Sequence, residues 1–432
     1  SGDDGCLRRP RPFDCPSAPA RGIDPLSAAA VAVVATLATI YIVSQFIRNS
    51  IGVIAPNLVS ELGLSPIEIG MLSSIYFFVF AATQLPLGVV LDRFGPRPCI
   101  LICIVLTAAG CWAFGLAQSA GQLVLSRALL GFATSSFLMA PVALYARWFA
   151  PSRFSTISGI HLGIGSFGAL FATAPLAFAA AHFGWRTAFL AIGTLTIALG
   201  AIAWFVVQDD PPGVRMEKPR ETLRQSVAGI WQVIRTPSIG RVFLVQFIGY
   251  PSYLLIVGLW GGPYLTHIYG YDLTGRGEIL FLAALAQVTG SFFWGPSDRL
   301  FGSYKIPILI GLSLLLVALL ILCVGGVLPT PVLIGVLLLI GFSTGLSPLL
   351  MAHGRSLVPP HLLGRAITLL NIGAMGGGFA GQSMSGAVIG LFPSAGGSYS
   401  LEAYRWVFGL QAILVVFGIV SYFSSKSGHL AR

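Results

Sequence analysis

Residues 88–97 read GVVLDRFGPR and join two apolar runs, near 65–91 and 98–118. One carboxylate and two arginines are concentrated here, between flanks that carry almost no charge. Each run is about as long as a helix needs to be to cross the hydrocarbon core of a bilayer, so the stretch predicts a tight surface loop between two membrane spans. A related stretch, GPSDRLFGSYK, occupies 295–305, and its Asp298-Arg299 follows Asp92-Arg93 by 206 residues.

Further matches between the two parts of the chain occur in the same order. GVIAPNL (52–58) pairs with WGGPYL (260–265), GFAT (131–134) with GFST (341–344), RFST (153–156) with RAIT (365–368), and GWRTAF (184–189) with YRWVF (404–408). An ordered repeat predicts two similar halves that place a binding site at their interface, near the middle of the membrane. The alternative is a repeated scaffold that moves nothing.

Composition predicts residence in a membrane. Hydrophobic residues make up 55% of 432 positions, charged residues only 9%, and the mean hydropathy is +0.85. A soluble domain needs about 25% charged residues to cover its surface. We therefore predict an all-α membrane protein with twelve transmembrane helices in two pseudo-symmetric six-helix bundles, near 27–58, 65–91, 98–118, 121–148, 153–180, 186–207, 238–268, 274–296, 304–326, 331–357, 363–391 and 402–424.

The polar segments and the basic residues predict the topology. We expect a disordered tail at 1–25 without a signal peptide, bundles at 26–207 and 238–425, a linker at 208–237 with a short surface helix near 221–234, and a tail at 426–432. Of the 25 lysines and arginines, 20 fall on the side of both termini. The positive-inside rule makes that side cytoplasmic, as in a bacterial inner membrane. The sequence contains no continuous basic stripe, so its charge does not indicate nucleic acid as a partner.

The 88–97 stretch resembles the signature between spans two and three of the major facilitator superfamily. Arg127-xxx-Gly131 is similar to a second motif of that family. Residues 159–175 only partly resemble the glycine-proline motif of its proton-driven antiporters, because the Gly-Pro dipeptide is missing. The resemblance covers the chain after residue 25. It implies a secondary transporter that works by alternating access, close to the bacterial organic-anion carriers.

The signature has a physical interpretation of its own. Gly88 would allow a neighbouring helix to approach closely, and Asp92 would bridge helices through arginines on the same face. By resemblance, the cluster is a latch that holds the outward-facing state: Gly88, Asp92, Arg93, Gly95, Arg97, Arg147, Arg153, Asp298 and Arg299. The alternative is charge that only sets topology.

Arg48 is the central candidate for binding a solute. It shares a helical face with Tyr41, Gln45, Asn49 and Gly52, and the matching face of the seventh span carries Gln246, Tyr250 and Tyr253. A buried cation costs about 3 kcal/mol on insertion scales, and the sequence has no Asp or Glu deep in any span. An anionic solute is therefore the natural partner. The alternative is an arginine bonded to backbone carbonyls or extended toward the membrane surface.

Other polar residues within the spans have two interpretations each. Arg127 either contributes to coupling or makes structural hydrogen bonds, and His161 is either a titrating group or a hydrogen-bonded core residue. Gln287 and Asn371, like Gln84 and Gln382, either line the cavity or only join helices. The lack of a buried carboxylate favours facilitated or exchange transport, or coupling through another group.

The sequence thus predicts a carrier for a small organic anion, such as a carboxylate or a phosphorylated metabolite. Its partners are that solute and the lipid bilayer, and we expect a monomer. An efflux transporter of amphipathic compounds and a transporter-like receptor are the alternatives. No cofactor motif, metal-ligand spacing or arrangement of catalytic residues indicates an enzyme.

Overall fold

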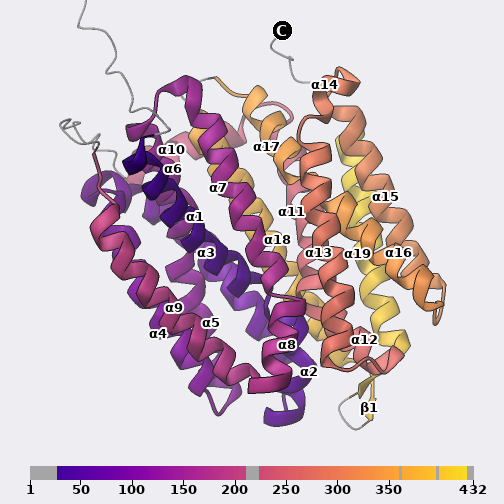
Figure 1. Ribbon diagram of the computed structural model, residues 1–432. Coiled ribbons are helices and arrows are strands. Elements are labelled where there is room, and N and C mark those ends of the chain that lie inside the picture. The colour runs from indigo at the N-terminus through magenta and orange to yellow at the C-terminus, as the bar shows by residue number, and fades with distance from the viewer. Residues whose placement is uncertain (1–26, 211–222, 360–361, 396–397, 426–432) are drawn as a thin grey trace, which may run out of the picture.

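The computed structural model describes residues 27–210, 223–359, 362–395 and 398–425. The predicted tails and most of the polar linker lie outside these residues. The described chain is helical except for one two-stranded hairpin, β1 (Ser394–Ala395) with β2 (Ser398–Tyr399). Figure 1 shows the helices as two groups side by side, with the N-terminal half on the left and the C-terminal half on the right.

The N-terminal half makes six passes. They are α1 (Ala28–Asn49) with α2 (Ile51–Leu62), α3 (Pro66–Phe94), α4 (Pro96–Leu116), α5 (Ala120–Thr134) with α6 (Ser136–Trp148), α7 (Pro151–Phe171) with α8 (Ala174–Phe183), and α9 (Trp185–Val206). A separate helix, α10 (Leu223–Ile234), then packs against α3 and α18.

The C-terminal half also makes six passes. They are α11 (Ile239–Leu255) with the π-helical turn η1 (Ile256–Trp260) and α12 (Gly261–Tyr269), α13 (Leu273–Trp294) followed by the short α14 (Ser297–Phe301), α15 (Lys305–Val324), α16 (Thr330–Thr344) with α17 (Ser347–Ser356), α18 (Leu363–Gly390) and α19 (Leu401–Phe423).

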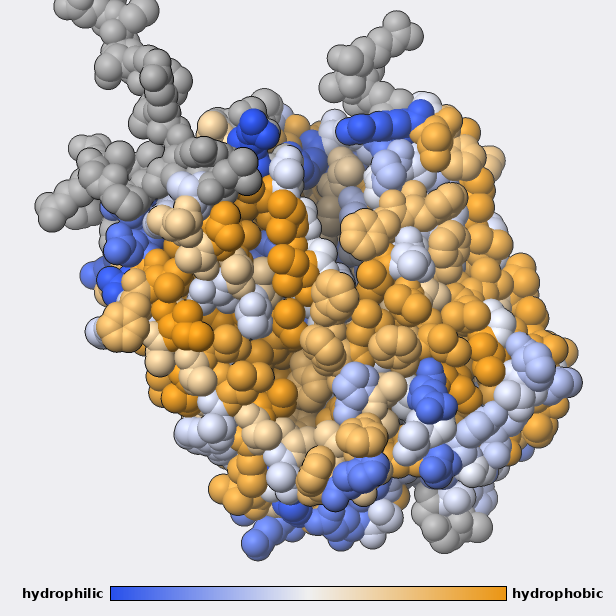
Figure 2. Space-filling model, viewed as in Figure 1, coloured by the Kyte–Doolittle hydropathy of each residue, from blue (hydrophilic) through white to orange (hydrophobic). Residues whose placement is uncertain are grey.

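The described residues form ten helical spans long and apolar enough to cross a membrane. An eleventh is obtained when α7 and α8, bent by 41° where they meet, are taken as one span. The remaining pass, α18, is 28 residues long but rich in glycine, which agrees with twelve passes. On the face seen in Figure 2, an apolar region lies between more hydrophilic ends.

The first predicted span is two helices that meet at Ser50. The Ser50 hydroxyl donates to the Ile47 carbonyl at 3.0 Å, and serine competes with the helical hydrogen-bond ladder in this way. The first pass of the C-terminal half is also irregular, because η1 interrupts it. Broken helices of this kind bring backbone polar groups into the middle of a membrane protein only where protein surrounds them.

The repeated GFAT and GFST segments make equivalent helix contacts in the two halves. A side chain at Gly131 on α5 would collide with the Tyr76 carbonyl on α3, and one at Gly341 on α16 would collide with the Ala283 carbonyl on α13. A glycine at each crossing lets two backbones touch. The sequence repeat is therefore a repeat of packing.

The two halves meet most closely at one end. We call the end that carries the start of α1, α10 and the end of α19 the terminal face, and the opposite end the distal face (Figure 1). Near the distal face, Gly262 on α12 contacts the Gly52 carbonyl on α2, and Gly70 on α3 packs against Gly386 on α18. Side chains at these positions would collide with the other half, so the seal is made by backbone.

The halves are separated by a cavity nearer the terminal face. It has a volume of about 550 Å³ and lies between α7 and α13. Its lining is almost wholly apolar: Thr156, Gly159, Ile160, Gly163, Ile164, Phe167, Leu170, Val288 and Phe292. Figure 2 shows the hollow between the two halves, in the upper part of the view.

Candidate functional site

Arg48 lies in the last turn of α1 and is 5% exposed. Its guanidinium carbon stands 5.0 Å from the centre of the Phe80 ring. The tyrosines Tyr41, Tyr76 and Tyr250 are near enough to interact with it electrostatically. These residues come from α1, α3 and α11, so both halves contribute. We call Arg48 with Tyr41, Tyr76, Phe80 and Tyr250 the Arg48 site.

Arg48 belongs to neither of the two ion pairs found among the described residues, so no carboxylate in them balances its charge. The ion pairs among the described residues join Arg147 to Asp210 and Arg186 to Glu61. Arg48 Nε and Tyr253 Oη are buried without a hydrogen-bond partner among the described residues, as are Gln45 Oε1, Asn49 Oδ1 and Asn371 Nδ2 elsewhere in the spans. Since a buried unpaired polar group costs about 1–3 kcal/mol, an anionic solute with further polar groups fits this centre.

Only some of the residues predicted to bind solute lie at the Arg48 site. Tyr250 does, and Tyr253 stacks on it with ring centres 6.4 Å apart. Gln246 instead donates to Ser347 within the C-terminal half at 2.8 Å, and the Gln287 side-chain amide lies 3.4 Å from Ser291 on its own helix. Gly52, predicted to share the cavity face, belongs to the distal seal because the helix breaks before it.

Arg127 makes structural contacts inside the N-terminal half. Fully buried, it donates to the Ile47 carbonyl at 2.7 Å, and its guanidinium carbon lies 4.6 Å from the centre of the Tyr76 ring. Tyr76 in turn shares a hydrogen bond with Thr134 at 2.7 Å. The Ile47 carbonyl, next to the break at Ser50, thus accepts from both the Ser50 hydroxyl and the Arg127 guanidinium.

Tyr76 and Phe80 are functional candidates that the sequence analysis missed. A signal for them was present, because Tyr76, Phe80 and Gln84 recur every four residues along the second span and so share one helical face. Both Gln84 side-chain atoms are buried without a partner. The spacing of polar and aromatic residues along the second span therefore predicts this face.

The 88–97 signature forms the turn from α3 to α4, but one prediction about it is wrong. A side chain built at Gly88 would meet nothing within 4 Å, so no helix approaches closely there. Gly95 carries the conformational demand, with φ at +95°, and its empty side-chain position is filled by Asp209. The Arg97 backbone amide donates to Asp209 at 2.7 Å, and its guanidinium donates to the Trp204 carbonyl at 2.8 Å.

Asp209 and Asp210, just after α9, are acidic partners of this cluster, although the sequence analysis assigned them to the linker. Asp210 pairs with Arg147 at 2.7 Å. Asp92 also has an interaction partner in the structure, whereas Arg93 and Arg153 are exposed. In the second copy, burial and the neighbouring Asp298 carboxylate raise the pKa of Tyr304, with Arg299 and Arg355 close by. The latch role of these residues stays a prediction.

Arg276 joins the two halves at the distal face. It falls near the start of the predicted span at 274–296, and it is only 4% exposed. From α13 it donates to the Val53 carbonyl at 2.9 Å and to Asn57 on α2, and it also holds Thr266 at 2.9 Å. These bonds cross from one half to the other, so Arg276 fastens α2 to the C-terminal half.

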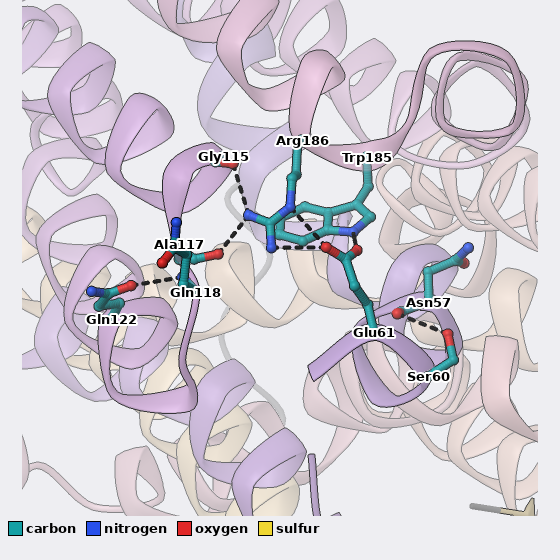
Figure 3. Close-up of polar contacts among 9 residues, drawn as sticks. All are labelled: Asn57, Ser60, Glu61, Gly115, Ala117, Gln118, Gln122, Trp185 and Arg186. Atoms are coloured by element: carbon teal, nitrogen blue, oxygen red, sulfur yellow. Dashed lines mark hydrogen bonds and ion pairs between the residues drawn. The ribbon is translucent and has the colours of Figure 1, made fainter. Parts of the chain in front are cut away.

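The far end of α2 is fastened to its own half. Figure 3 shows the Glu61 carboxylate receiving hydrogen bonds from Trp185 at 2.6 Å and from Arg186 at 2.9 Å. Arg186 also donates to the carbonyls of Gly115 and Ala117 (Figure 3). One guanidinium thus ties α2, α9 and the turn after α4 together.

The chain is similar to several proteins named as membrane transporters. A nitrate/nitrite transporter, NrtP, of Nostoc punctiforme is 34% identical over 201 residues, which cover 44% of this chain and 40% of that protein. The hexuronate transporter of Escherichia coli is 25% identical over 314 residues, which cover 65% of this chain and 72% of that transporter. The chain thus spans less than half the length of the Nostoc relative in that match.

Solved structures show the same fold at low sequence identity. A bacterial homolog of the human lysosomal transporter Spinster superposes with a TM-score of 0.76 at 17% identity, covering 92% of this chain and 97% of that one. The nucleoside transporter NupG gives a TM-score of 0.71 at 14% identity, covering 91% and 99%. The model of one family, the Major Facilitator Superfamily, matches residues 37–382. With most of its length matched by that model, the chain belongs to the Major Facilitator Superfamily.

Proposed function

We propose that this protein is a secondary transporter that moves a small organic anion across the bilayer by alternating access. The observation that carries the proposal is Arg48, a buried guanidinium ringed by Phe80 and tyrosines from both halves. A carboxylate or phosphate would give the guanidinium a bidentate partner. The nitrate/nitrite, hexuronate and galacturonate transporters among the relatives support an anion as the cargo.

Alternating access follows from how the halves meet. Backbone contacts and Arg276 close the distal face, while an apolar cavity separates α7 from α13 nearer the terminal face. With both termini in the cytoplasm of a bacterial cell, as the arginine census predicts, this is the inward-facing state. A green fluorescent protein fused to the C-terminus should then fluoresce, and a dark fusion in a correctly folded carrier would reverse the orientation.

Counterflow in proteoliposomes tests the proposal. Vesicles loaded with unlabelled hexuronate, sulfoacetate, nitrate or a phosphorylated sugar should take up the labelled form of at least one of these anions. Arg48→Gln should weaken its apparent affinity by about thirty- to hundredfold, as the loss of charge-assisted hydrogen bonds implies. Arg235→Gln is the matched control, because Arg235 is exposed and stacks on Trp231 at the end of α10.

Two results would contradict the anion assignment. Exchange of lipophilic cations in preference to every anion would favour the efflux transporter. Binding of an anion without any counterflow would favour a receptor, a class to which one relative belongs by name: the membrane sensor protein UhpC of Salmonella typhimurium, 22% identical over 284 residues. Unchanged anion affinity in Arg48→Gln would remove Arg48 from the site.

A further inference from the structure

A buried histidine lies one side chain away from Arg48. His161, in the middle of α7, is 0% exposed. Its ring stacks on Tyr41, with ring centres 4.9 Å apart and planes inclined by 20°. Tyr41 in turn interacts electrostatically with the Arg48 guanidinium. Tyr41 therefore lies between His161 and Arg48 and interacts with both side chains.

The two ring nitrogens of His161 have different surroundings. Nδ1 lies 3.0 Å from the Tyr145 hydroxyl of α6. Nε2 is buried and makes no hydrogen bond of good geometry among the described residues, although the Phe137 backbone lies near enough to the ring to interact with it. A tyrosine hydroxyl can donate or accept, so Tyr145 can pair with Nδ1 in either charge state of the ring. A purely structural histidine would be expected to satisfy both nitrogens.

No described carboxylate contacts the His161 ring. α7 packs against α1, α6, α8 and α13. The titratable side chains that touch the ring are Tyr41 from α1 and Tyr145 from α6. α13 presents Val288 and Phe292 to the cavity beside α7. On α8, His182 is exposed and bonds to Phe178 of its own helix. Arg48, beyond Tyr41, is therefore the charge of the binding site to which His161 is linked.

We infer that His161 carries a proton through the transport cycle, so that the anion bound at Arg48 and one proton move together. The inference rests on the proposed function. In the neutral ring, Nδ1–H donates to the Tyr145 oxygen and Nε2 holds a free electron pair. A proton from the aqueous phase adds at Nε2, and the same N–H bond breaks to release it on the other side.

The coupling has an electrostatic cause. An imidazolium beside a guanidinium in a low-dielectric interior places two like charges close together, and an anion at Arg48 compensates them. The anion therefore favours protonation of His161, and by linkage the proton favours anion binding to the same extent. A monoanion and one proton then cross as an electrically neutral pair.

The test is accumulation driven by a pH difference, in proteoliposomes whose membrane potential is clamped at zero. For a monoanion that exchanges in counterflow, a lumen one pH unit more alkaline than the outside should drive about tenfold accumulation, the limit for one proton per anion. Protein-free liposomes measure passive entry of the protonated acid. His161→Gln should keep counterflow and lose the accumulation, whereas His182→Gln, the exposed control, should keep both.

The outcomes separate this inference from the proposed function. No counterflow of any anion in the wild-type protein contradicts the proposed function itself. Counterflow without accumulation in the wild type, or accumulation that persists in His161→Gln, contradicts only the proton role. A positioning role for His161 through Tyr41 would instead reduce counterflow and accumulation in parallel. If His161→Gln does not fold, Tyr145→Phe serves in its place: the pH giving half-maximal accumulation should shift by about one unit, and an unchanged pH would overturn the inference.

Discussion

Two buried arginines of the N-terminal half illustrate how the same residue serves different ends. Arg127 donates a hydrogen bond to the Ile47 carbonyl beside the break in the first span, and its guanidinium lies over the Tyr76 ring. Arg48 lies over Phe80 among tyrosines and has no described hydrogen bond to backbone. Both guanidinium groups keep buried unpaired nitrogens, Nε of Arg48 and Nε and Nη2 of Arg127. A buried cation that is hydrogen-bonded to backbone stabilises the fold, whereas one without such a partner is available for a solute. Sequence position distinguishes the two only weakly.

Arg127→Ala should destabilise the protein. It removes the charge-assisted hydrogen bond to the Ile47 carbonyl, which keeps only the Ser50 hydroxyl as a donor, and this should lower the free energy of unfolding by about 1.5–3 kcal/mol. Thermal unfolding of the detergent-solubilised protein, followed by intrinsic tryptophan fluorescence, measures the change. Arg93→Ala is the matched control, because Arg93 is exposed and its guanidinium lies over the neighbouring Phe94 ring. Equal melting temperatures for the two variants would assign Arg127 to transport instead of to stability.

At the scale of helices, close packing depends on glycines where two backbones cross, and membership of a family motif does not by itself identify them. Gly131 and Gly341 occupy equivalent crossings, α5 on α3 and α16 on α13, and each leaves no room for a side chain. Gly88 belongs to the family signature, yet nothing lies within 4 Å of its absent side chain. Close contact between transmembrane helices depends on such small residues because there is no hydrophobic gain from helix association within lipid.

Leucine substitutions should separate these glycines. Gly131→Leu and Gly341→Leu would force two helices apart, at a cost of about 1–3 kcal/mol or more, and should reduce the yield of monodisperse protein in size-exclusion chromatography. Gly88→Leu should leave that yield and the melting temperature near those of the wild type. A loss of folded protein in Gly88→Leu would show that a helix does approach Gly88 in another state of the cycle.

For the whole molecule, α2 is the element that both halves hold. Arg276 fastens Asn57 and the Val53 carbonyl to the C-terminal half, while Glu61 is fastened to Trp185 and Arg186 of the N-terminal half. The break at Ser50 separates α2 from α1. Opening the distal face therefore requires release at Arg276, whereas the bonds of Glu61 can persist through the cycle.

Arg276→Ala should shift the molecule toward a state open at the distal face. Spin labels at Ser119 and Thr330, exposed on the distal loops of the two halves, report the separation by double electron–electron resonance in a background without native cysteines. The variant should add a longer distance to the distribution. Arg405→Ala is the control, since Arg405 also lies near the distal face but donates to the Cys323 carbonyl within its own half. An unchanged distribution in Arg276→Ala would show that the backbone seal alone closes this face.

Local sequence determined the class, the spans and the two halves. Apolar runs of membrane length, the distribution of basic residues and an ordered repeat can all be identified along the chain without knowledge of how the helices pack. The polar face of the first span likewise follows from helical periodicity, which placed Tyr41, Gln45 and Arg48 together. The family motif added the expected fold, in agreement with the model match over residues 37–382.

The tertiary structure alone decided which residues meet. Tyr76 and Phe80 reach Arg48 from another helix, Asp209 fills the space at Gly95, and Arg276 lies 223 residues from the Val53 carbonyl that it binds. It also showed that Gly88 has no close neighbour and that the first span breaks at Ser50. These outcomes depend on how helices rotate and cross against one another. That geometry minimises voids and unpaired polar groups over the whole assembly, so no single segment of sequence encodes it.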